Sequence, residues 1–320
     1  MTLGKISSRL IDANNIAIFT HTNPDCDGFG SMFALYEGLT SLGKKCSMFV
    51  DGQLDKFESQ IFDQSKVNKT NLAPEKFDTF VSVDCGTLAL LGNYGDVFSL
   101  FENTYKIDHH RNVEQYAKNC YVDHESASCC EIIYELLKKM HVEVTKKIAT
   151  YLYAGIATDT GSFINTNTTS KSYKIAGEMV EEGADTIKIN KLCFRSQTKE
   201  SVSLLKLFYD RIKIIDDRFA YVIVNKKDFK KTKTSHMETS FWGNMLCSIE
   251  GVILACAITE RGDKFNLSIR SQANGLAEKY GQMLGGGGHP DAAGARIFKK
   301  QKEVEKIVIK TAKELLQGIK

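Results

Sequence analysis

Residues 15–31 read NIAIFTHTNPDCDGFGS, and this stretch decides the fold that we expect for the first half of the chain. The mostly apolar Asn15–Thr20 predicts a buried strand, and Gly28–Leu42 has apolar residues at helical spacing. Between these two segments stand His21, Asp25 and Asp27. In doubly wound sheets, ligands bind where a strand ends and the next helix begins. This loop is therefore the first candidate site.

The alternation of short apolar strands and amphipathic helices continues outward from this stretch. Strands are predicted at Cys46–Val50, Thr79–Val83 and Tyr105–Ile107, and a helix at Glu131–Met140. Strands that alternate with helices predict a mostly parallel sheet that is covered on both faces. We therefore expect an α/β fold with a doubly wound, mostly parallel sheet.

The character of the sequence changes after about residue 195. Lys199–Arg211 predicts a connecting helix, and hairpin-like strands follow at 212–215, 219–224, 252–259 and 265–271. The apolar stripe of Lys302–Leu316 predicts a closing helix. A chain of 320 residues is long enough for two domains. We predict a first domain at residues 1–195 and a smaller α+β domain at residues 196–320.

Composition excludes several classes of protein. The 42 basic and 39 acidic residues leave a formal net charge of +3, which argues against a polybasic nucleic-acid-binding protein. No run approaches the roughly 18 apolar residues of a membrane span, and the opening MTLGKISSRLIDANN lacks the apolar core of a signal peptide. The nine cysteines contain no CxxC pair. We therefore expect reduced thiols, no structural zinc and a cytoplasmic location.

Three further segments lead directly into aspartate or histidine residues, as the strand predicted at Asn15–Thr20 leads into His21. They are Thr79–Val83 before Asp84, Tyr105–Ile107 before Asp108, His109 and His110, and Ala154–Ala157 before Asp159. Either Asp25 or Asp27, taken alone, could be a simple helix cap. Bringing so many acids together would be repulsive unless cations neutralised them. The convergence therefore predicts a metal site.

The types of candidate ligand narrow the choice of metal. Carboxylates and imidazoles without a thiolate pattern favour Mn²⁺ or Mg²⁺, and imidazole shifts the preference toward Mn²⁺. The number of candidate ligands exceeds the number that one ion needs, so we expect two ions that share one aspartate as a ligand. Paired ions about 3.5–4 Å apart serve phosphoryl transfer. Cys26 and Cys85 lie beside candidate ligands, but we expect both to be small buried spacers.

The motifs together resemble those of the DHH phosphoesterase superfamily. The N-terminal ones are His21-x-x-x-Asp25-x-Asp27, Val83-Asp84, Asp108-His109-His110 and Asp159-Thr-Gly. The C-terminal Ser268-Ile-Arg270-Ser271 and Gly285-Gly-Gly-Gly-His289 resemble the DHH-associated substrate-binding domain. The resemblance spans residues 15 to about 300. The short two-domain form is similar to the family members that act as both oligoribonuclease and 3′-phosphoadenosine 5′-phosphate (PAP) phosphatase.

The resemblance implies a role for each N-terminal motif residue. One Mn²⁺ would be bound by His21, Asp25 and Asp84, and the second by Asp27, Asp84, His109 and Asp159. Asp84 would bridge the two ions, and Mg²⁺ or Co²⁺ could replace Mn²⁺. Asp108 would orient His109, and His110 would face the scissile phosphate. The catalytic candidates are therefore Asp84, Asp108 and His110.

The resemblance also implies that the second domain binds substrate, across a cleft from the metals. The candidate residues are Arg270, Ser271, Gly286, Gly287, Gly288 and His289. The residue types agree, because a glycine run can expose backbone N–H groups to an anion and arginine suits bidentate phosphate binding. The alternative for the glycine run is a flexible turn, and the alternative for Arg270 is a surface ion pair.

The activity implied is that of a Mn²⁺-dependent hydrolase that cleaves short oligoribonucleotides to nucleoside monophosphates and PAP to AMP. We expect its partner to be short single-stranded RNA or a small nucleotide, and we expect no association with a membrane. Formation of a homodimer is left open. The alternatives are a phosphodiesterase of cyclic or linear dinucleotides (c-di-AMP or pApA), a single-strand DNA exonuclease, and a nucleotide sensor without turnover. Two positions depart from the family pattern: Leu90 replaces a basic residue, and Cys129 replaces a small hydroxyl residue.

Overall fold

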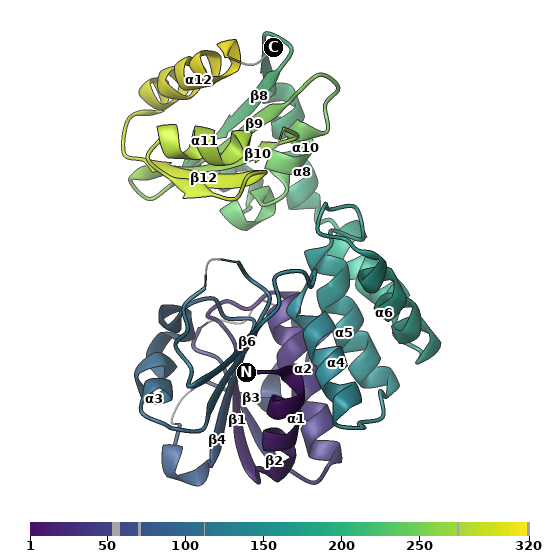
Figure 1. Ribbon diagram of the computed structural model, residues 1–320. Helices are drawn as coiled ribbons and strands as arrows, with labels where there is room; N and C mark the ends of the chain where they lie inside the picture. The colour runs from purple at the N-terminus through teal and green to yellow at the C-terminus, as the bar shows by residue number, and fades with distance from the viewer. Residues whose placement is uncertain (53–57, 70–71, 112, 274, 319–320) are drawn as a thin grey trace. The chain divides into compact units, whose positions relative to one another are not determined.

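The computed structural model describes residues 1–52, 58–69, 72–111, 113–273 and 275–318. Within these ranges the chain divides into two compact units, Met1–Ser196 and Gln197–Lys320. The boundary expected from the sequence lies one residue earlier. Each unit contains one six-stranded sheet (Figure 1).

The first unit is built on an entirely parallel sheet. Its strands are β1 (Asn15–Phe19), β2 (Lys45–Phe49), β3 (Val67–Asn68), β4 (Thr79–Val83), β5 (Thr104–Asp108) and β6 (Asn119–Val122). They lie in the order β3-β2-β1-β4-β5-β6, and each pair of neighbours is parallel. The order reverses between β1 and β4, and open α/β sheets bind ligands at the carboxyl ends of strands at such a switch point.

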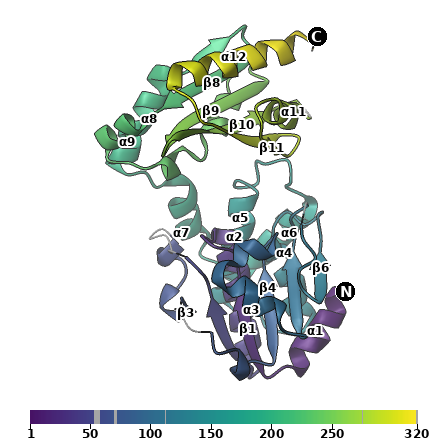
Figure 2. The ribbon, with the colours of Figure 1, turned by 90° about the vertical axis from the view of Figure 1, so that its left-hand side faces the viewer.

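Helices cover both faces of this sheet (Figures 1 and 2). One face carries α1 (Leu3–Asp12), α2 (Cys26–Ser41), α4 (Cys129–Lys139) and α5 (Lys146–Asp159), which share a large apolar core. The other face carries the short α3 (Gly95–Ser99) and η4 (Leu88–Tyr94) over a smaller core. The remaining helical elements of this unit are α6 (Ser170–Glu181), α7 (Thr186–Asn190), η1 (Glu58–Gln60), η2 (Gln64–Lys66), η3 (Pro74–Lys76) and the π-helical η5 (Lys191–Arg195).

The second unit is a mixed sheet that also has helices on both faces. Its strands are β7 (Lys213–Ile215), β8 (Phe219–Val224), β9 (Leu254–Arg261), β10 (Lys264–Ser271), β11 (Gly287–Gly288) and β12 (Ala292–Ile297). They lie in the order β11-β12-β10-β9-β8-β7, and only β8 and β9 pair in parallel. One face packs on α11 (Leu276–Met283) and α12 (Gln301–Gln317). The other face packs on α8 (Lys199–Arg211), α9 (Lys226–Thr232) and α10 (Trp242–Cys247), near η6 (His236–Thr239).

The predicted fold class is confirmed, several element bounds differ from the prediction by one or two residues, and two differences bear on the site. Ala154–Ala157 does not end as a strand does, because it belongs to helix α5, whose last residue is Asp159. This helix is buried along most of its length, so it lacks the polar face that reveals a helix in sequence. The helix expected at Glu131–Met140 begins two residues earlier, where the Ser128 hydroxyl caps it.

The cysteines agree with the expectation of reduced thiols. All nine lie in the described ranges, and within those ranges none takes part in a disulfide bond. Cys26 and Cys85 are both buried, as expected of spacers. Across those same ranges, none of the helices combines the length and the apolar character that crossing a bilayer requires.

Candidate metal centre

The metal-ligand candidates lie at the carboxyl ends of β1, β4 and β5 and at the ends of two helices. His21 follows β1, Asp84 follows β4, and His109 follows the last residue of β5. Asp84 has a φ of 52°, so the chain turns as soon as it leaves the strand. Aspartate is one of the few residues that tolerate this left-handed conformation, because its short polar side chain can bond locally.

Two of the three side-chain clusters found within the described ranges contain only predicted metal ligands, and the first of these comprises His21, Asp25 and Asp84; the remaining cluster joins Asp84, His109 and His110. His21 Nε2 lies 3.6 Å from Asp84 Oδ2 and 4.0 Å from Asp25 Oδ1. Asp25 is also the N-cap of α2, since its Oδ1 accepts the backbone N–H groups of Asp27 and Gly28. The helix-cap alternative for Asp25 is therefore correct, and it does not remove Asp25 from the cluster.

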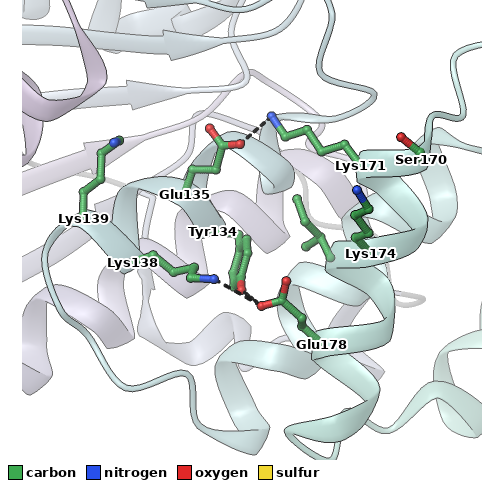
Figure 3. Close-up of a pocket in the computed structure, with 9 residues that line it drawn as sticks. Tyr134, Glu135, Lys138, Lys139, Ser170, Lys171, Lys174 and Glu178 are labelled. Carbon is green, nitrogen blue, oxygen red and sulfur yellow. Dashed lines mark hydrogen bonds and ion pairs between the residues drawn. The ribbon is translucent and has the colours of Figure 1, made fainter.

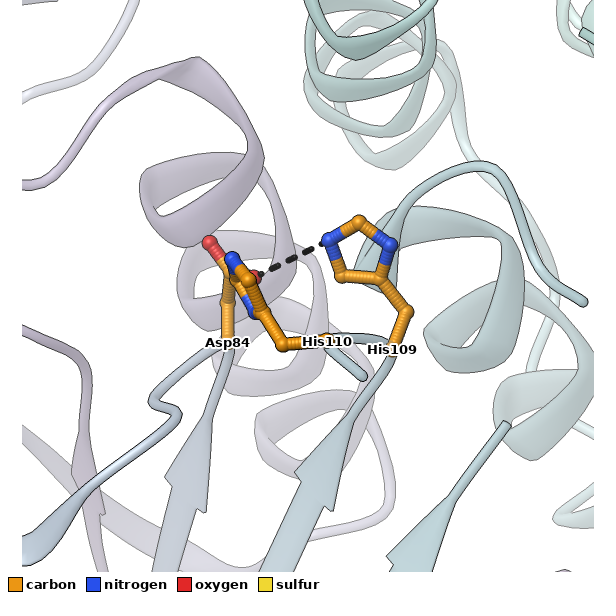
Figure 4. Close-up of side chains that lie close together, drawn as sticks. All are labelled: Asp84, His109 and His110. Atoms are coloured by element: carbon orange, nitrogen blue, oxygen red, sulfur yellow. Dashed lines mark ion pairs between the residues drawn. The ribbon is translucent and has the colours of Figure 1, made fainter. Parts of the chain in front are cut away.

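The second cluster contains Asp27, His109 and Asp159. His109 Nε2 lies 3.7 Å from Asp27 Oδ2 and 3.3 Å from Asp159 Oδ2. It also lies 3.6 Å from Asp84 Oδ1, and Figure 4 marks this ion pair with a dashed line. The two oxygens of Asp84 thus face different imidazoles: Oδ2 faces His21 of the first cluster, and Oδ1 faces His109 of the second and, at 3.5 Å, Nδ1 of His110. This is the arrangement that a carboxylate bridging two ions needs.

Helix α4 holds Asp27 through its backbone. Asp27 Oδ2 accepts the N–H of Cys129 at 2.6 Å, and Oδ1 accepts the N–H of Cys130 at 2.9 Å. The first N–H groups of a helix lack partners within the helix, and the helix dipole favours an anion there. Because the backbone makes both contacts, a cysteine at position 129 preserves the support that Asp27 receives.

Asp108 supports His110 and not the ring of His109. Asp108 Oδ1 lies 2.8 Å from His110 Nδ1, and it accepts the backbone N–H groups of both histidines. His109 Nδ1 instead lies 3.3 Å from the carbonyl oxygen of Ser126. The expectation that Asp108 orients the ring of His109 is therefore wrong. The two rings leave the end of β5 in different directions, and only that of His110 turns back to Asp108.

Sequence reasoning missed Lys106, which lies on β5 and is fully buried. Its Nζ lies 3.2 Å from Asp108 Oδ2 and donates to the carbonyl oxygens of Gly86 and Glu114 at 3.0 Å each. A buried ammonium group is tolerated only when it is paired and hydrogen-bonded. The signal that could have revealed Lys106 was its place inside a strand whose other residues are also buried.

Burial and mutual repulsion raise the pKa values of the acids. Burial first, and then the charge of Asp84, raise the pKa of Asp27 to about 7. Burial and the neighbouring acids raise the pKa of Asp159 well above its usual value. Such a concentration of carboxylates carries a negative potential that bound cations would neutralise.

Two histidines of the candidate centre, His21 and His110, have pKa values that neighbouring aspartates shift. Burial lowers the pKa of His21, but the hydrogen bond and charge of Asp84 outweigh burial and raise the pKa to about 9. The pKa of His110 is also raised to about 9, chiefly by its hydrogen bond to Asp108. The raised pKa values of these two histidines and those of Asp27 and Asp159 have the same cause, the negative potential of the clustered carboxylates.

The donor set fits a pair of divalent cations. Asp84 Oδ1 is buried and has no hydrogen-bond partner within the described ranges, although buried polar atoms nearly always have one. A ligand outside the chain would satisfy it. Gly28 keeps the space open, because a Cβ there would lie 2.7 Å from Thr20 Oγ1 and 3.1 Å from His21 Nε2. Carboxylates with imidazoles suit Mn²⁺ or Mg²⁺.

A groove of about 640 Å³ between α4 and α6 contains none of the metal-ligand candidates (Figure 3). Its charged residues are Glu135, Lys138, Lys139, Lys171, Lys174 and Glu178. Lys171 Nζ lies 2.8 Å from Glu135 Oε1 and donates to Ser126 Oγ at 3.0 Å. Because the carbonyl of Ser126 contacts His109, we interpret this side of the groove as support for the loop beside His109.

Two of the substrate-binding candidates, Arg270 and Ser271, lie on opposite faces of β10, because side chains alternate along a strand. Arg270 donates from Nε to Asn244 Oδ1 and from Nη1 to the carbonyl of Ile269, both at 2.8 Å. The hydroxyl of Ser271 instead bonds to the carbonyls of Ile253 and Ala273. The structure therefore does not bring Ser271 beside Arg270.

The glycine run packs closely on β12. A Cβ on Gly286 would lie 2.0 Å from the oxygen of Gly294, and one on Gly288 would lie 2.5 Å from the oxygen of Ala292. The N–H of Gly286 donates to Gly281, and that of the exposed His289 donates to Ala292. These N–H groups are therefore hydrogen-bonded within the chain. The sequence had suggested the opposite, that they would be exposed to a ligand. Gly287, by contrast, has nothing within 4 Å of its ideal Cβ position.

Residues 15–156 match the family described as "DHH family, N-terminal domain". These residues are therefore similar to a DHH family domain. This match confirms the resemblance that the motifs suggested, and it includes every proposed metal ligand except Asp159. The matched segment begins with β1 and ends within α5.

The similarity to known proteins extends over nearly the whole chain. The bifunctional oligoribonuclease and PAP phosphatase NrnA of Bacillus subtilis is 29% identical over 292 residues, which cover 89% of this chain and 90% of that protein. An exopolyphosphatase-related protein of Bacteroides fragilis has the same fold, with a TM-score of 0.89 and 21% identity over 98% of this chain and 96% of that one. RecJ of Thermus thermophilus, in complex with Mn²⁺, has a TM-score of 0.55 and 15% identity over 97% of this chain and 55% of its own.

Proposed function

We propose that this chain is a Mn²⁺-dependent phosphoesterase that hydrolyses short oligoribonucleotides to nucleoside monophosphates and PAP to AMP. The DHH domain and the relative from B. subtilis place the chain among hydrolases that act on phosphoester bonds of nucleotides or nucleic acids. That relative carries both finer activities in its name, and this supports the choice of substrates. The observation that carries the proposal is Asp84, whose two oxygens face two separate clusters.

In this proposal each cluster binds one divalent cation. His21, Asp25 and Asp84 bind the first, and the second is bound by Asp27, Asp84, His109 and Asp159. When bound, the two cations lower the pKa of water and offset the charge of the attacked phosphate. Imidazole ligands in both clusters favour Mn²⁺ among the hard divalent ions.

His110 is proposed to face the scissile phosphate. Its side chain is 51% exposed, whereas that of Asp84 is 2% exposed, so His110 lies at the open side of the cluster. Asp108 engages Nδ1, which leaves Nε2 to donate a hydrogen bond to a phosphate oxygen. Arg270 and His289 of the second unit are proposed to bind the nucleotide.

Hydrolysis assays with and without Mn²⁺ test the proposal. After EDTA treatment, short RNA and PAP should remain intact, and added Mn²⁺ should restore the release of nucleoside monophosphates and AMP. Asp84→Asn should lower kcat/KM by more than about 100-fold, equivalent to about 2.7 kcal/mol of transition-state stabilisation. The exposed Asp12, on α1, provides the matched control Asp12→Asn, which should retain full activity.

Two results would contradict the proposal. A folded Asp84→Asn protein within tenfold of wild-type activity would refute the bridging role. Turnover of c-di-AMP or pApA without turnover of short RNA or PAP would instead assign the chain as a dinucleotide phosphodiesterase.

A further inference from the structure

A cavity of about 240 Å³ on the second unit has no role in the function proposed above. Its polar lining residues are Thr239, Ser240, Thr259, Arg261, Asn266 and Ser268. Thr239 and Thr259 are each 4% exposed, so the cavity is a recess in the sheet face and not a flat patch. Among the described residues, none that lines it is acidic.

Two polar atoms in the cavity wall lack partners. Arg261 Nε and Asn266 Oδ1 are both buried, and neither has a hydrogen-bond partner in the part of the chain that the structure describes. Buried polar atoms are nearly always bonded, and an unpaired one destabilises the fold. Together these atoms offer a ligand one donor and one acceptor.

The sheet face around the cavity is basic. The alternation of side chains places Thr259 and Arg261 of β9 on the same face as Asn266, Ser268 and Arg270 of β10. Lys264 of β10 and Arg296 of β12 share this face, and none of the acidic residues described in these three strands does. Burial and the nearby charge of Arg296 both lower the pKa of Arg261. The positive potential is therefore not balanced within the sheet.

Exposed aromatic rings lie next to this face. Phe241 directly follows the cavity residue Ser240 and is 58% exposed. Phe298 follows the last residue of β12 and is 63% exposed, and its ring centroid lies 5.6 Å from Lys264 Nζ. A cationic surface with aromatic rings on which bases stack is how proteins bind single-stranded nucleic acid without reading its sequence.

We propose that this cavity binds a phosphodiester of single-stranded RNA beyond the nucleotide at the metal centre, with the adjoining base stacked on Phe241. The proposal rests on the function proposed above and defines which oligoribonucleotides the chain prefers. Arg261 donates to the phosphate, and Asn266 and Ser268 bind the phosphate or the ribose. Arg270 lies on the same strand and face, two residues after Ser268, so the cavity extends the nucleotide surface that the motif predicts.

The consequence is a preference for length. PAP has no further nucleotide to place in the cavity, whereas a chain of five nucleotides has several. The cavity therefore raises kcat/KM for the longer substrate and contributes little to that for PAP.

The experiment compares a pentaribonucleotide with PAP in the full-length, Mn²⁺-loaded protein. For Arg261→Gln, the ratio of kcat/KM for the pentaribonucleotide to that for PAP should fall roughly tenfold, as expected for the loss of one charge-assisted hydrogen bond. For Phe241→Ala the ratio should fall by about fivefold or more, as expected for the loss of base stacking. Arg218→Gln, at the turn between β7 and β8, removes the same charge from the same unit and should leave the ratio unchanged.

Binding is measured separately from turnover. In the Asp84→Asn background, a fluorescent pentaribonucleotide should bind about tenfold more weakly once Arg261→Gln is added. Phe241 is exposed, so Phe241→Ala tests the proposal even if Arg261→Gln fails to fold. Two results would overturn the inference. The first is a ratio of kcat/KM values equal to that of wild type in both variants. The second is that millimolar inorganic phosphate displaces the labelled RNA as efficiently as unlabelled RNA does. Wild-type protein that cleaves neither substrate, yet binds the RNA through Arg261, would overturn the proposed function alone.

Discussion

Three charged side chains near the metal centre are each held by a different kind of partner. Asp84 lies between two imidazoles, Asp27 accepts backbone N–H groups at the start of α4, and Asp108 lies beside the buried Lys106. Each partner lowers the free energy of a buried negative charge, which would otherwise be high in a poorly solvated site. Asp27 and Asp108 therefore depend on neighbours that are not proposed to bind metal or substrate, whereas the neighbours of Asp84 are proposed ligands themselves.

Lys106 provides a test of this dependence. In Lys106→Met, Asp108 would lose its cationic partner and would hold His110 less firmly. We expect kcat/KM to fall by about 10- to 100-fold, as for the loss of a charged hydrogen bond, with the change mainly in kcat and an unchanged metal content. Steady-state kinetics and elemental analysis measure these quantities, at a temperature where circular dichroism shows folded protein.

A double variant separates positioning from general damage. If Lys106 acts through His110, adding Lys106→Met to His110→Ala should cause little further loss, because the positioned group is already absent. Independent, additive losses would show that Lys106 acts in another way. Lys118→Met removes an exposed lysine and should leave kinetics unchanged.

Among the elements, helices α2, α4 and α5 meet so closely that they need glycine at their contacts. A Cβ on Gly155 of α5 would lie 2.3 Å from Cys130 Sγ of α4 and 2.7 Å from Asp27 Oδ1 of α2. A Cβ on Gly30 of α2 would lie 2.6 Å from the carbonyl oxygen of Tyr151. The close approach of these helices sets the position of the candidate metal centre, because α2 carries Asp27, its N-cap is Asp25, and α5 carries Asp159.

Gly155→Ala should therefore destabilise the first unit by about 1–3 kcal/mol, the usual effect of overpacking a core. It should also weaken Mn²⁺ binding, because the new methyl group displaces Asp27. Gly177→Ala in α6 is the matched control: its Cβ meets nothing within 4 Å, so replacing a helical glycine should stabilise by about 0.5–1 kcal/mol. Thermal unfolding and metal titration measure both effects, and a stabilising Gly155→Ala would refute the packing argument.

At the scale of the whole molecule, the two units have separate cores. The core of the first unit joins the sheet to α1, α2, α4 and α5, and both metal-ligand clusters lie in this unit. The second unit has cores on both faces of its own sheet. Metal binding should therefore affect the stability of the first unit alone.

Calorimetry with and without Mn²⁺ tests this division. Free Mn²⁺ at about 100 times its Kd should stabilise the first unit by about 2.7 kcal/mol, and the transition of the second unit should not move. Asp84→Asn should abolish the shift. Equal shifts of both transitions would indicate that the units unfold together.

The same experiment should depend on pH. In metal-free protein the pKa of Asp27 is raised from 3.8 to about 7, and that of His21 from 6.5 to about 9. Folded protein thus retains protons that unfolded protein has lost, so the stability of the metal-free first unit falls as pH rises from about 4 to 9. Because cations bind the deprotonated groups, the Mn²⁺-induced shift should grow over this range. A shift that shrinks between about pH 6 and 9 would contradict the assignment.

The sequence by itself determined the strand and helix pattern and the chemistry of the site. Lys199–Arg211 and Phe219–Val224 were predicted to the residue, because apolar periodicity is a local property. The candidate ligands also came from local motifs that each follow a strand or begin a helix. Asp159 was placed on the wrong kind of element, because a helix buried on most sides shows no polar face.

Only the tertiary structure decided which partner each of these groups has. Asp27 bonds to backbone groups about 100 residues further along the chain, and the ring that Asp108 holds belongs to His110 although His109 is its direct neighbour. The cavity around Arg261 exists because β9, β10 and β12 lie side by side. Hydrogen bonds and cavities depend on distance and direction between segments that meet only after folding, and no local pattern encodes these quantities.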